Sequence, residues 1–302
     1  MTLSKEISPV TGEPFTEFIK EISAGNIIDR YNEIHIDVRR FFEGIDNVEI
    51  RKCGRTGYRY YFPFGIFGDA GFYEDLQKNR EDYYPTDKWE HLQAIQHIKA
   101  GQSVLEVGCA TGYFLDMIRK KKAVGVGLEM NKKAIAEARQ QGFDIFEEYL
   151  REHSVSHEGK YDAVCSFQVL EHIADVKDYF ESAKRCLKPG GKIIAAVPNS
   201  NPYLHKYDLY HTMNLPPHHA GMWNKATFRK VAEYFDLTTV YLKTERLKEY
   251  KTWYKIQANH IKQKRPLLGG LMLLVPRQVY KSLLWAASPL IEGRNVLAIF
   301  SK

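Results

Sequence analysis

The chain of 302 residues lacks the features that mark secreted or membrane-spanning proteins. Its N-terminal sequence, MTLSKEISPV, has no apolar core, so we expect no signal peptide. The longest apolar run, from Pro266 to Pro276, is far shorter than the ~20 residues that cross a bilayer. Cysteines are few and form no CxxC pair, which favours reduced and mostly buried thiols at Cys53, Cys109, Cys165 and Cys186. The sequence therefore predicts a cytoplasmic protein.

Acidic residues are scarce in one late segment of the chain. Between Lys243 and Lys281, ten lysines and arginines stand against two glutamates, which gives this segment a formal charge of +8. The whole chain carries +6, so the remainder is close to neutral. The basic character belongs to one segment, and no nucleic-acid recognition motif accompanies it. We therefore expect no nucleic-acid partner.

Strand-like and helix-like stretches alternate from about residue 102 onward. The strand-like runs lie at 103–107, 123–128, 143–146, 161–167, 192–197, 238–242 and 295–300. This alternation predicts an α/β fold, with a doubly wound, seven-stranded and mostly parallel sheet that carries helices on both faces. Ligands of such sheets bind at the carboxyl ends of the strands, near the topological switch point.

Parts of the chain depart from this alternation. We predict a separate N-terminal unit at residues 1–66, a linking and lid helix region at 67–100, and a main domain at 101–302. The main domain carries two insertions, a substrate loop at 199–223 and a basic, apolar helical segment at 248–294. For the second insertion three interpretations stay open: a packed helical insertion, a membrane-surface helix pair, and a lid or homodimer contact.

A glycine-rich turn joins the first strand of the main domain to its first helix, in the sequence VLEVGCATGYFL from Val104 to Leu115. Gly108 and Gly112 let a ligand approach the backbone, and the helix N-terminus offers unpaired N–H groups. The GxxxG spacing differs from the dinucleotide fingerprint GxGxxG. Glu106 would repel a pyrophosphate but suits an amino group or a sulfonium. Glu129, at the end of the second strand, suits the two hydroxyls of a ribose.

Four motifs occur in order across roughly residues 83–242, namely VLEVGCATGYF, GLEMN, FQVLEHI and LKPGGKII. Together they resemble the motifs of class I S-adenosylmethionine-dependent methyltransferases. The resemblance implies that S-adenosylmethionine is the cofactor. It implies cofactor contacts from Glu106, Gly108, Cys109 and Gly112 (methionine part), Glu129 (ribose), Met130 and Tyr149 (adenine), Gln168 (transferable methyl) and Tyr84 (cover of the cofactor).

Histidines gather in the sequence after the fifth strand, where His205, His211, His218 and His219 lie. Methyl transfer to an oxygen requires removal of its proton, a task that suits histidine near neutral pH. We predict His219 or His218 as this base and His172 as the third candidate; a loop whose histidines only bond their own backbone is the alternative. The element Pro216–His219 resembles one in bacterial methyltransferases that act on sugars and related small metabolites. The spacing matches no zinc pattern, so we predict no metal.

Two short turns of the N-terminal unit share a spacing, Ser8–Gly12 and Cys53–Gly57. With cysteines at positions 8, 11, 53 and 56, they would be the two knuckles of a zinc ribbon, which related methyltransferases often carry. Only Cys53 and the two glycines are present. Our hypothesis is a degenerate zinc-ribbon-like unit without zinc, and two ordinary glycine turns are the alternative.

The sequence thus predicts an S-adenosylmethionine-dependent methyltransferase that methylates an oxygen of a small metabolite, sugar or glycan, with a histidine as general base. Two alternatives stay open: a non-catalytic scaffold that keeps the cofactor fold, and methylation of nitrogen, carbon or a lipid-linked acceptor. We expect a small-molecule or glycan acceptor as partner. Peripheral membrane contact through 248–294 and a homodimer are further expectations.

Overall fold

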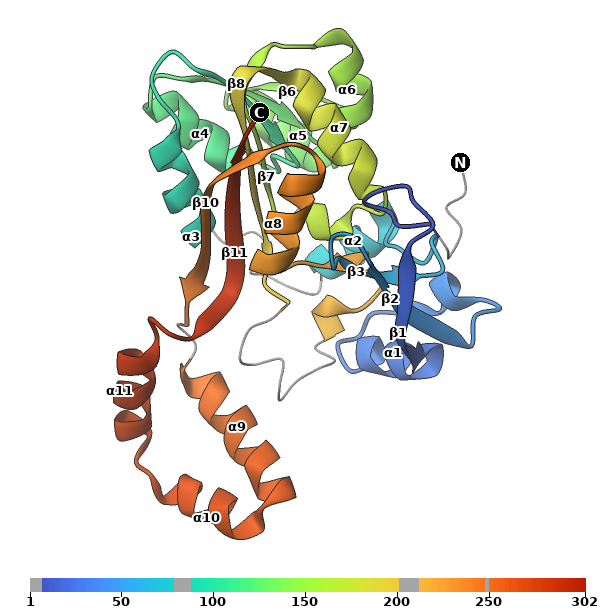
Figure 1. The fold of residues 1–302 in the computed structure, drawn as a ribbon, viewed down its shortest axis with the longest axis vertical. Coiled ribbons are helices and arrows are strands. Elements are labelled where there is room, and N and C mark those ends of the chain that lie inside the picture. Colours follow the sequence, from blue (N-terminus) through green and yellow to red (C-terminus); the bar gives the residue numbers. More distant parts are fainter. Residues whose placement is uncertain (1–6, 79–87, 201–211, 248–249) are drawn as a thin grey trace.

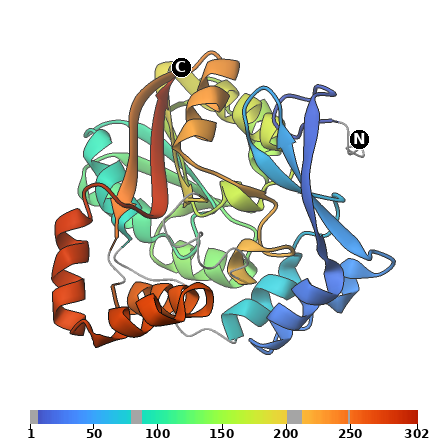
Figure 2. The ribbon, with the colours of Figure 1, turned by 60° about the horizontal axis from the view of Figure 1, so that its bottom comes forward.

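Two β-sheets organise the chain, one of four strands and one of seven. The computed structural model describes residues 7–78, 88–200, 212–247 and 250–302. In the large sheet the strand order is β10-β11-β8-β7-β4-β5-β6, and helices lie on both of its faces (Figure 1). The small sheet has the order β1-β2-β3-β9 and lies beside the large one (Figure 2).

The large sheet is mostly parallel, as predicted. Its strands are β4 (Ser103–Val107), β5 (Val124–Leu128), β6 (Asp144–Phe146), β7 (Tyr161–Phe167), β8 (Leu187–Pro198), β10 (Thr238–Arg246) and β11 (Glu292–Ser301). Only β11 runs antiparallel to its neighbours. The order changes direction at β4, so the topological switch point lies at the end of the first strand of the domain. The predicted seven-stranded, doubly wound fold is confirmed.

Helices cover both faces of the large sheet, as the alternation of strands and helices predicts (Figure 1). They are α3 (Trp89–Ala94), α4 (Tyr113–Lys120), α5 (Lys132–Gln140), α6 (Leu150–Ser156), α7 (Val176–Cys186) and α8 (Lys225–Tyr234), with 3-10 turns η2 (Ile95–His97) and η3 (Leu170–His172). Asn131 caps α5, because its side chain accepts from two backbone N–H groups of the first turn.

The core of the large sheet consists of strands buried on both faces. The central residues of β4, β7, β8 and β11 are buried, among them Val104–Val107, Ala163–Phe167, Ile193–Val197 and Val296–Phe300, which explains why the sequence of these segments is largely apolar. The four cysteines are free and buried, as predicted, and they pack as small apolar side chains in this core and at its border.

The small sheet combines strands from the N-terminal unit and from the main domain. Strands β1 (Thr16–Ser23), β2 (Asn47–Cys53) and β3 (Arg59–Phe62) come from the N-terminal unit, while β9 (Gly221–Met222) comes from the predicted substrate loop. Helices α1 (Ala24–Asn32) and α2 (Ala70–Lys78) and the turn η1 (Arg39–Phe42) complete this part. The main domain therefore supplies one edge of the N-terminal sheet.

The two knuckle-like turns adopt matching conformations, with Gly12 and Gly57 both at φ +71°. The hydroxyls of Ser8, Thr11 and Thr56 are buried and accept hydrogen bonds from backbone N–H groups of their own turns. Hydroxyls thus bond the backbone at three of the four positions that thiolates would hold in a zinc ribbon. The hypothesis of a ribbon without zinc stays a prediction.

The N-terminal turns share one hydrophobic core with the main domain. Val10, Cys53 and Tyr58 belong to the same buried cluster as Phe180 and Trp223. The ring of Tyr58 lies 4.7 Å from that of Trp223, and both side chains are fully buried. Such continuous packing ties the two parts into one cooperative unit.

Replacing Tyr58 by alanine tests this coupling. Loss of its buried ring is expected to lower the free energy of unfolding by about 3–5 kcal/mol, as for other large aromatic truncations. We expect a single unfolding transition in urea, shifted as a whole. The control Phe18→Ala removes a ring that is 55% exposed on β1 and should change stability by less than about 0.5 kcal/mol. Two separate transitions, with only the first one shifted, would show that the N-terminal part unfolds alone.

The insertion between β10 and β11 forms three helices, α9 (Tyr250–Lys264), α10 (Pro266–Leu274) and α11 (Arg277–Ala287). They extend away from the large sheet and form the lower end of the molecule in Figure 1. In the described part of the chain, no helix is both long enough and apolar enough to span a membrane.

Candidate active site

The glycine-rich turn after β4 has the shape that the sequence predicts. Gly108 and Gly112 have φ of +71° and +87°, a region that favours glycine. A Cβ on Gly108 would lie 2.5 Å from Val169, and one on Gly112 would lie 2.7 Å from Phe143. The backbone N–H of Gly108 donates to the carbonyl of Leu128 at 2.8 Å, which holds the turn against the end of β5. Both glycines are therefore required by conformation and by space.

Glu129 follows β5 at the same edge of the sheet. Its carboxylate accepts three backbone N–H groups, from Ala110 at 2.9 Å, Met130 at 2.8 Å and Asn131 at 2.9 Å. These bonds fix the carboxylate beside the glycine turn. Met130 and Asn131 both donate to Oε1 and Ala110 donates to Oε2, so one of the four lone-pair directions, on Oε2, is left to accept from a ribose hydroxyl.

Glu106 lies beneath the turn on β4 and is 3% exposed. Its Oε2 atom has no hydrogen-bond partner. Burial raises the pKa of Glu106 well above its usual value. The positive charge of Lys88 lowers this pKa, and the negative charge of Glu129 raises it. A buried carboxyl group with an unpaired oxygen fits the ammonium and sulfonium groups of S-adenosylmethionine.

Two further glutamates are buried with an unpaired oxygen in the same way, although they were not predicted from the sequence. Glu90 on α3 and Glu171 on η3 are each 2% exposed, and each has an Oε2 atom without a partner. Burial raises the pKa of Glu90, and it raises the pKa of Glu171 to about 8. The amide of Gln168, which has φ +57°, donates to Glu90 Oε1 at 3.2 Å. The site thus holds an excess of buried acidic groups, which is complementary to a cation.

The remaining predicted cofactor residues differ in placement. The Cys109 sulfur packs against Gly127, where a Cβ would lie 2.4 Å from it. Met130 is exposed at the edge next to Glu129, and Tyr149 is 64% exposed just before α6. Tyr84 lies outside the described residues.

Three predicted base candidates converge. Ring nitrogens of His172, His218 and His219 lie within 4.8 Å of one another. The Nδ1 of His172 donates to the carbonyl of His218, and the Nδ1 of His218 donates to the carbonyl of Met213. Burial lowers the pKa of His172 to about 4, so it is neutral at pH 7. Such a cluster also has metal-ligand proximity, and the absence of a metal stays a prediction. His205 and His211 lie outside the described residues.

The N-terminal unit holds the histidine loop in place. The hydroxyl of Tyr31 donates to the carbonyl of Leu215 at 2.9 Å, and that of Tyr61 donates to the carbonyl of Asn214 at 2.8 Å. From the other side, the N–H of Ala220 donates to the carbonyl of Glu171 at 2.7 Å. The loop is therefore fixed between the small sheet and the segment after β7.

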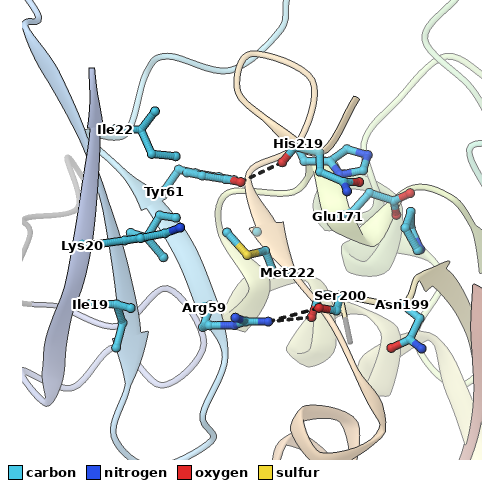
Figure 3. Close-up of a pocket in the computed structure, with 14 residues that line it drawn as sticks. Ile19, Lys20, Ile22, Arg59, Tyr61, Glu171, Asn199, Ser200, His219 and Met222 are labelled. Carbon is cyan, nitrogen blue, oxygen red and sulfur yellow. Dashed lines mark hydrogen bonds between the residues drawn. The ribbon is translucent and has the colours of Figure 1, made fainter. Parts of the chain in front are cut away.

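A pocket of about 100 Å³ opens between these parts (Figure 3). Residues of the small sheet form one wall, including Arg59 and Tyr61, and His219, Glu171 and Ser200 lie on the other. Arg59 donates to the carbonyl and the hydroxyl of Ser200. Among the described residues, no carboxylate forms an ion pair with its guanidinium. Of the three clustered histidines, only His219 lines this pocket.

Sequence reasoning missed Glu90, Glu171 and Arg59. Glu171 stands inside the quoted motif FQVLEHI, three residues after Gln168, so its position carried a signal. Arg59 and Glu90 lie outside the four motifs. Their placement depends on contacts between segments far apart in the chain.

Comparison with known proteins agrees with this geometry. The methyltransferase domain family matches residues 77–242, more than half of the chain. The chain belongs to this family of methyltransferase domains. The matched segment contains the glycine turn, Glu129 and the segment after β7.

The chain is also similar to curated methyltransferases and to solved methyltransferase structures. Ubiquinone biosynthesis O-methyltransferases of Sodalis glossinidius and Klebsiella pneumoniae are 31% and 30% identical over 108 and 107 residues. These matches cover 34% and 33% of this chain and 43% and 44% of the relatives, so the chain matches less than half of their length. A methyltransferase from Archaeoglobus fulgidus has the same fold, with a TM-score of 0.55 and 16% identity over 76% of this chain and all of that one.

Removal of the Glu129 carboxylate tests the ribose contact. We expect Glu129→Ala to weaken binding of S-adenosylhomocysteine at least tenfold, a loss of about 1.4 kcal/mol, measured by calorimetric titration. The matched control is Glu147→Ala, because Glu147 follows the next strand and its only ion pair among the described residues is an exposed one with Lys132 at 4.0 Å. Equal weakening in both variants would contradict a specific role for Glu129.

The pKa of Glu171 predicts a pH-dependent difference in stability. Its folded value of about 8 lies above the ordinary 4.5, so between these values the folded protein keeps a proton that the unfolded chain has released. This contribution to stability is lost as the pH rises through that window. Glu171→Gln removes the effect, so the variant should gain on wild type between pH 5 and pH 8, by at least about 1 kcal/mol or roughly 2–4 °C in Tm. A difference that is constant with pH would show that Glu171 ionises normally.

Proposed function

We propose that the protein methylates a hydroxyl oxygen of an acceptor that enters the pocket between the small sheet and the histidine loop. The observation that carries the proposal is the position of His219 in the wall of this pocket, with Glu171 beside it and Arg59 opposite. The curated relatives are named as O-methyltransferases, which supports oxygen as the accepting atom.

The pocket adjoins the cofactor site through the segment after β7. Gln168 donates to Glu90 and Val169 lies against Gly108, while Glu171, two residues after Val169, lines the pocket. An acceptor in the pocket would therefore meet the cofactor across this segment. Such an arrangement aligns donor and acceptor and excludes water, which is the main task in methyl transfer.

His219 has the chemistry for the proton transfer. Its side chain is buried, which shields it from bulk water, and an imidazole accepts a proton readily near neutral pH. S-adenosylmethionine supplies the electrophilic methyl group when it is bound. His219 would take the proton of the acceptor hydroxyl as the new carbon–oxygen bond forms and the methyl–sulfur bond breaks, which leaves S-adenosylhomocysteine and a protonated imidazole. Glu171, protonated at neutral pH, would add no negative charge beside the oxygen.

Arg59 gives the pocket a preference for one acceptor type. Its guanidinium is partly buried and bonds only neutral oxygens of Ser200 among the described residues. Burial lowers its pKa, and an anionic group would compensate the buried charge. We therefore favour acceptors that carry a carboxylate or an ionised phenol near the methylated hydroxyl.

A panel of acceptors tests the proposal. Catechols, hydroxybenzoates, uronic acids and neutral sugars are incubated with the protein and methyl-labelled S-adenosylmethionine, and products are identified by mass spectrometry. With the best acceptor, His219→Gln should lower kcat by about 100-fold or more. The control His97→Gln alters a histidine that contacts Tyr241 outside the pocket and should leave kcat unchanged. A product methylated on nitrogen or carbon, or full activity of His219→Gln, would contradict the proposal.

A further inference from the structure

Helix α10 exposes apolar side chains that a soluble surface helix normally buries. Among its nine residues only Gly269 is buried, while Leu267, Leu271 and Leu274 are 88%, 62% and 77% exposed. On α11 the side chain of Trp285 is 69% exposed. Scattered exposed leucines are ordinary, but a contiguous apolar surface of this kind marks an interaction site.

The three helices are packed against one another. The exposure of these leucines is therefore not the result of poor packing between the helices. Helix α10 crosses α9 closely, since a Cβ on Gly269 would lie 2.4 Å from the Cα of Lys262. The hydroxyl of Tyr254 on α9 lies 3.3 Å from the carbonyl oxygens of Met272 and Leu273, to which it donates. Backbone and tyrosine thus fill the contact between the two helices, and the leucines face outward.

Cations surround this apolar surface. From residue 250 to residue 291 the chain has seven lysines and arginines and no aspartate or glutamate. Lys262, Lys264 and Arg265 are exposed just before α10, and Arg277 and Lys281 are exposed just after it. Leucines flanked by cations on an interfacial helix match an anionic bilayer, which takes up apolar side chains and attracts positive charge.

The same charges argue against a second copy of this chain on the surface. Two copies joined through α10 would bring their lysines and arginines together without a carboxylate from either segment. A nucleic acid would attract the cations but would leave the leucines in water. The observations therefore favour a lipid surface over both.

We propose that α10, with the flanking ends of α9 and α11, binds the surface of an anionic phospholipid bilayer, with the α10 leucines in the interface and the cations on the headgroups. This binding lies on the membrane surface and crosses no bilayer. It goes beyond the methyl transfer proposed above and does not depend on it.

The position of the helices sets the orientation of the bound protein. Strand β10 ends, and β11 begins, at the same edge of the sheet where β4 ends, because β10 runs parallel to β8, β7 and β4. The helical insertion therefore leaves from the edge that carries the glycine turn and Glu129 (Figures 1 and 2). A protein docked through α10 holds its cofactor edge toward the bilayer, where an amphipathic acceptor would reside.

Vesicle flotation tests the proposal on the full chain. Vesicles of phosphatidylcholine alone are compared with vesicles of phosphatidylcholine and phosphatidylglycerol in equal parts. We expect binding to the mixed vesicles, at least tenfold weaker binding to phosphatidylcholine, and weakening by salt. The triple variant Leu267→Ser, Leu271→Ser, Leu274→Ser should lose binding at least tenfold, and so should Lys262→Gln, Lys264→Gln, Arg265→Gln.

Matched controls alter exposed residues elsewhere. Leu92→Ser, Val124→Ser, Val155→Ser removes exposed apolar side chains from the large domain, and Lys121→Gln, Lys122→Gln, Lys133→Gln removes the same number of exposed cations. Both control variants should bind vesicles as wild type does. All variants should bind S-adenosylhomocysteine unchanged, which separates this test from that of the proposed function.

Three results would overturn the proposal. The first is no binding to either kind of vesicle by the folded wild type. The second is binding that the leucine variant retains. The third is a stable dimer in solution that the leucine variant dissociates, which would make α10 a contact between copies.

Discussion

Three carboxyl groups buried at the carboxyl edge of the large sheet set the character of this protein. Glu90, Glu106 and Glu171 come from three separate elements, and each has one oxygen without a hydrogen-bond partner. Unpaired polar atoms in a core cost free energy, and they persist where function requires them. S-adenosylmethionine carries an ammonium and a sulfonium group, and these positive charges would be partners for the unpaired carboxyl groups. In the complex that we expect, the glycine turn and Glu129 would fix where that cation lies.

The small sheet gives the site its second half. Tyr31 and Tyr61 bond the carbonyls of the loop that carries His219, and the strand β9 of that loop pairs with β3. The pocket that we propose for the acceptor exists because these parts are packed together. A separate N-terminal unit would be free to move relative to the cofactor site. The shared core around Tyr58 and Trp223 instead holds the pocket in a fixed position relative to that site.

Local sequence patterns predicted most of the fold and the glycine-rich turn with its two neighbouring acids. The turn glycines, Glu106 and Glu129 lie within short segments whose strand–turn–helix order the sequence itself displays. The residues around the pocket proposed for the acceptor were harder to predict from the sequence. Pairing of the two-residue strand β9 with β3, the approach of Arg59 to Ser200 and the burial of Glu90 join segments that lie far apart in the chain. No periodicity or spacing specifies such contacts, so only the histidines of the loop were foreseen.

The most direct test of this account is calorimetric titration of S-adenosylmethionine near pH 7 in buffers of different ionisation enthalpy, which counts the protons exchanged on binding. If the buried glutamates hold protons in the free protein and face a cation in the complex, binding should release about one proton. The same titration with S-adenosylhomocysteine, which lacks the sulfonium charge, should release fewer. Tight binding without proton release would show that the buried carboxyl groups are already ionised and paired, and would contradict the account.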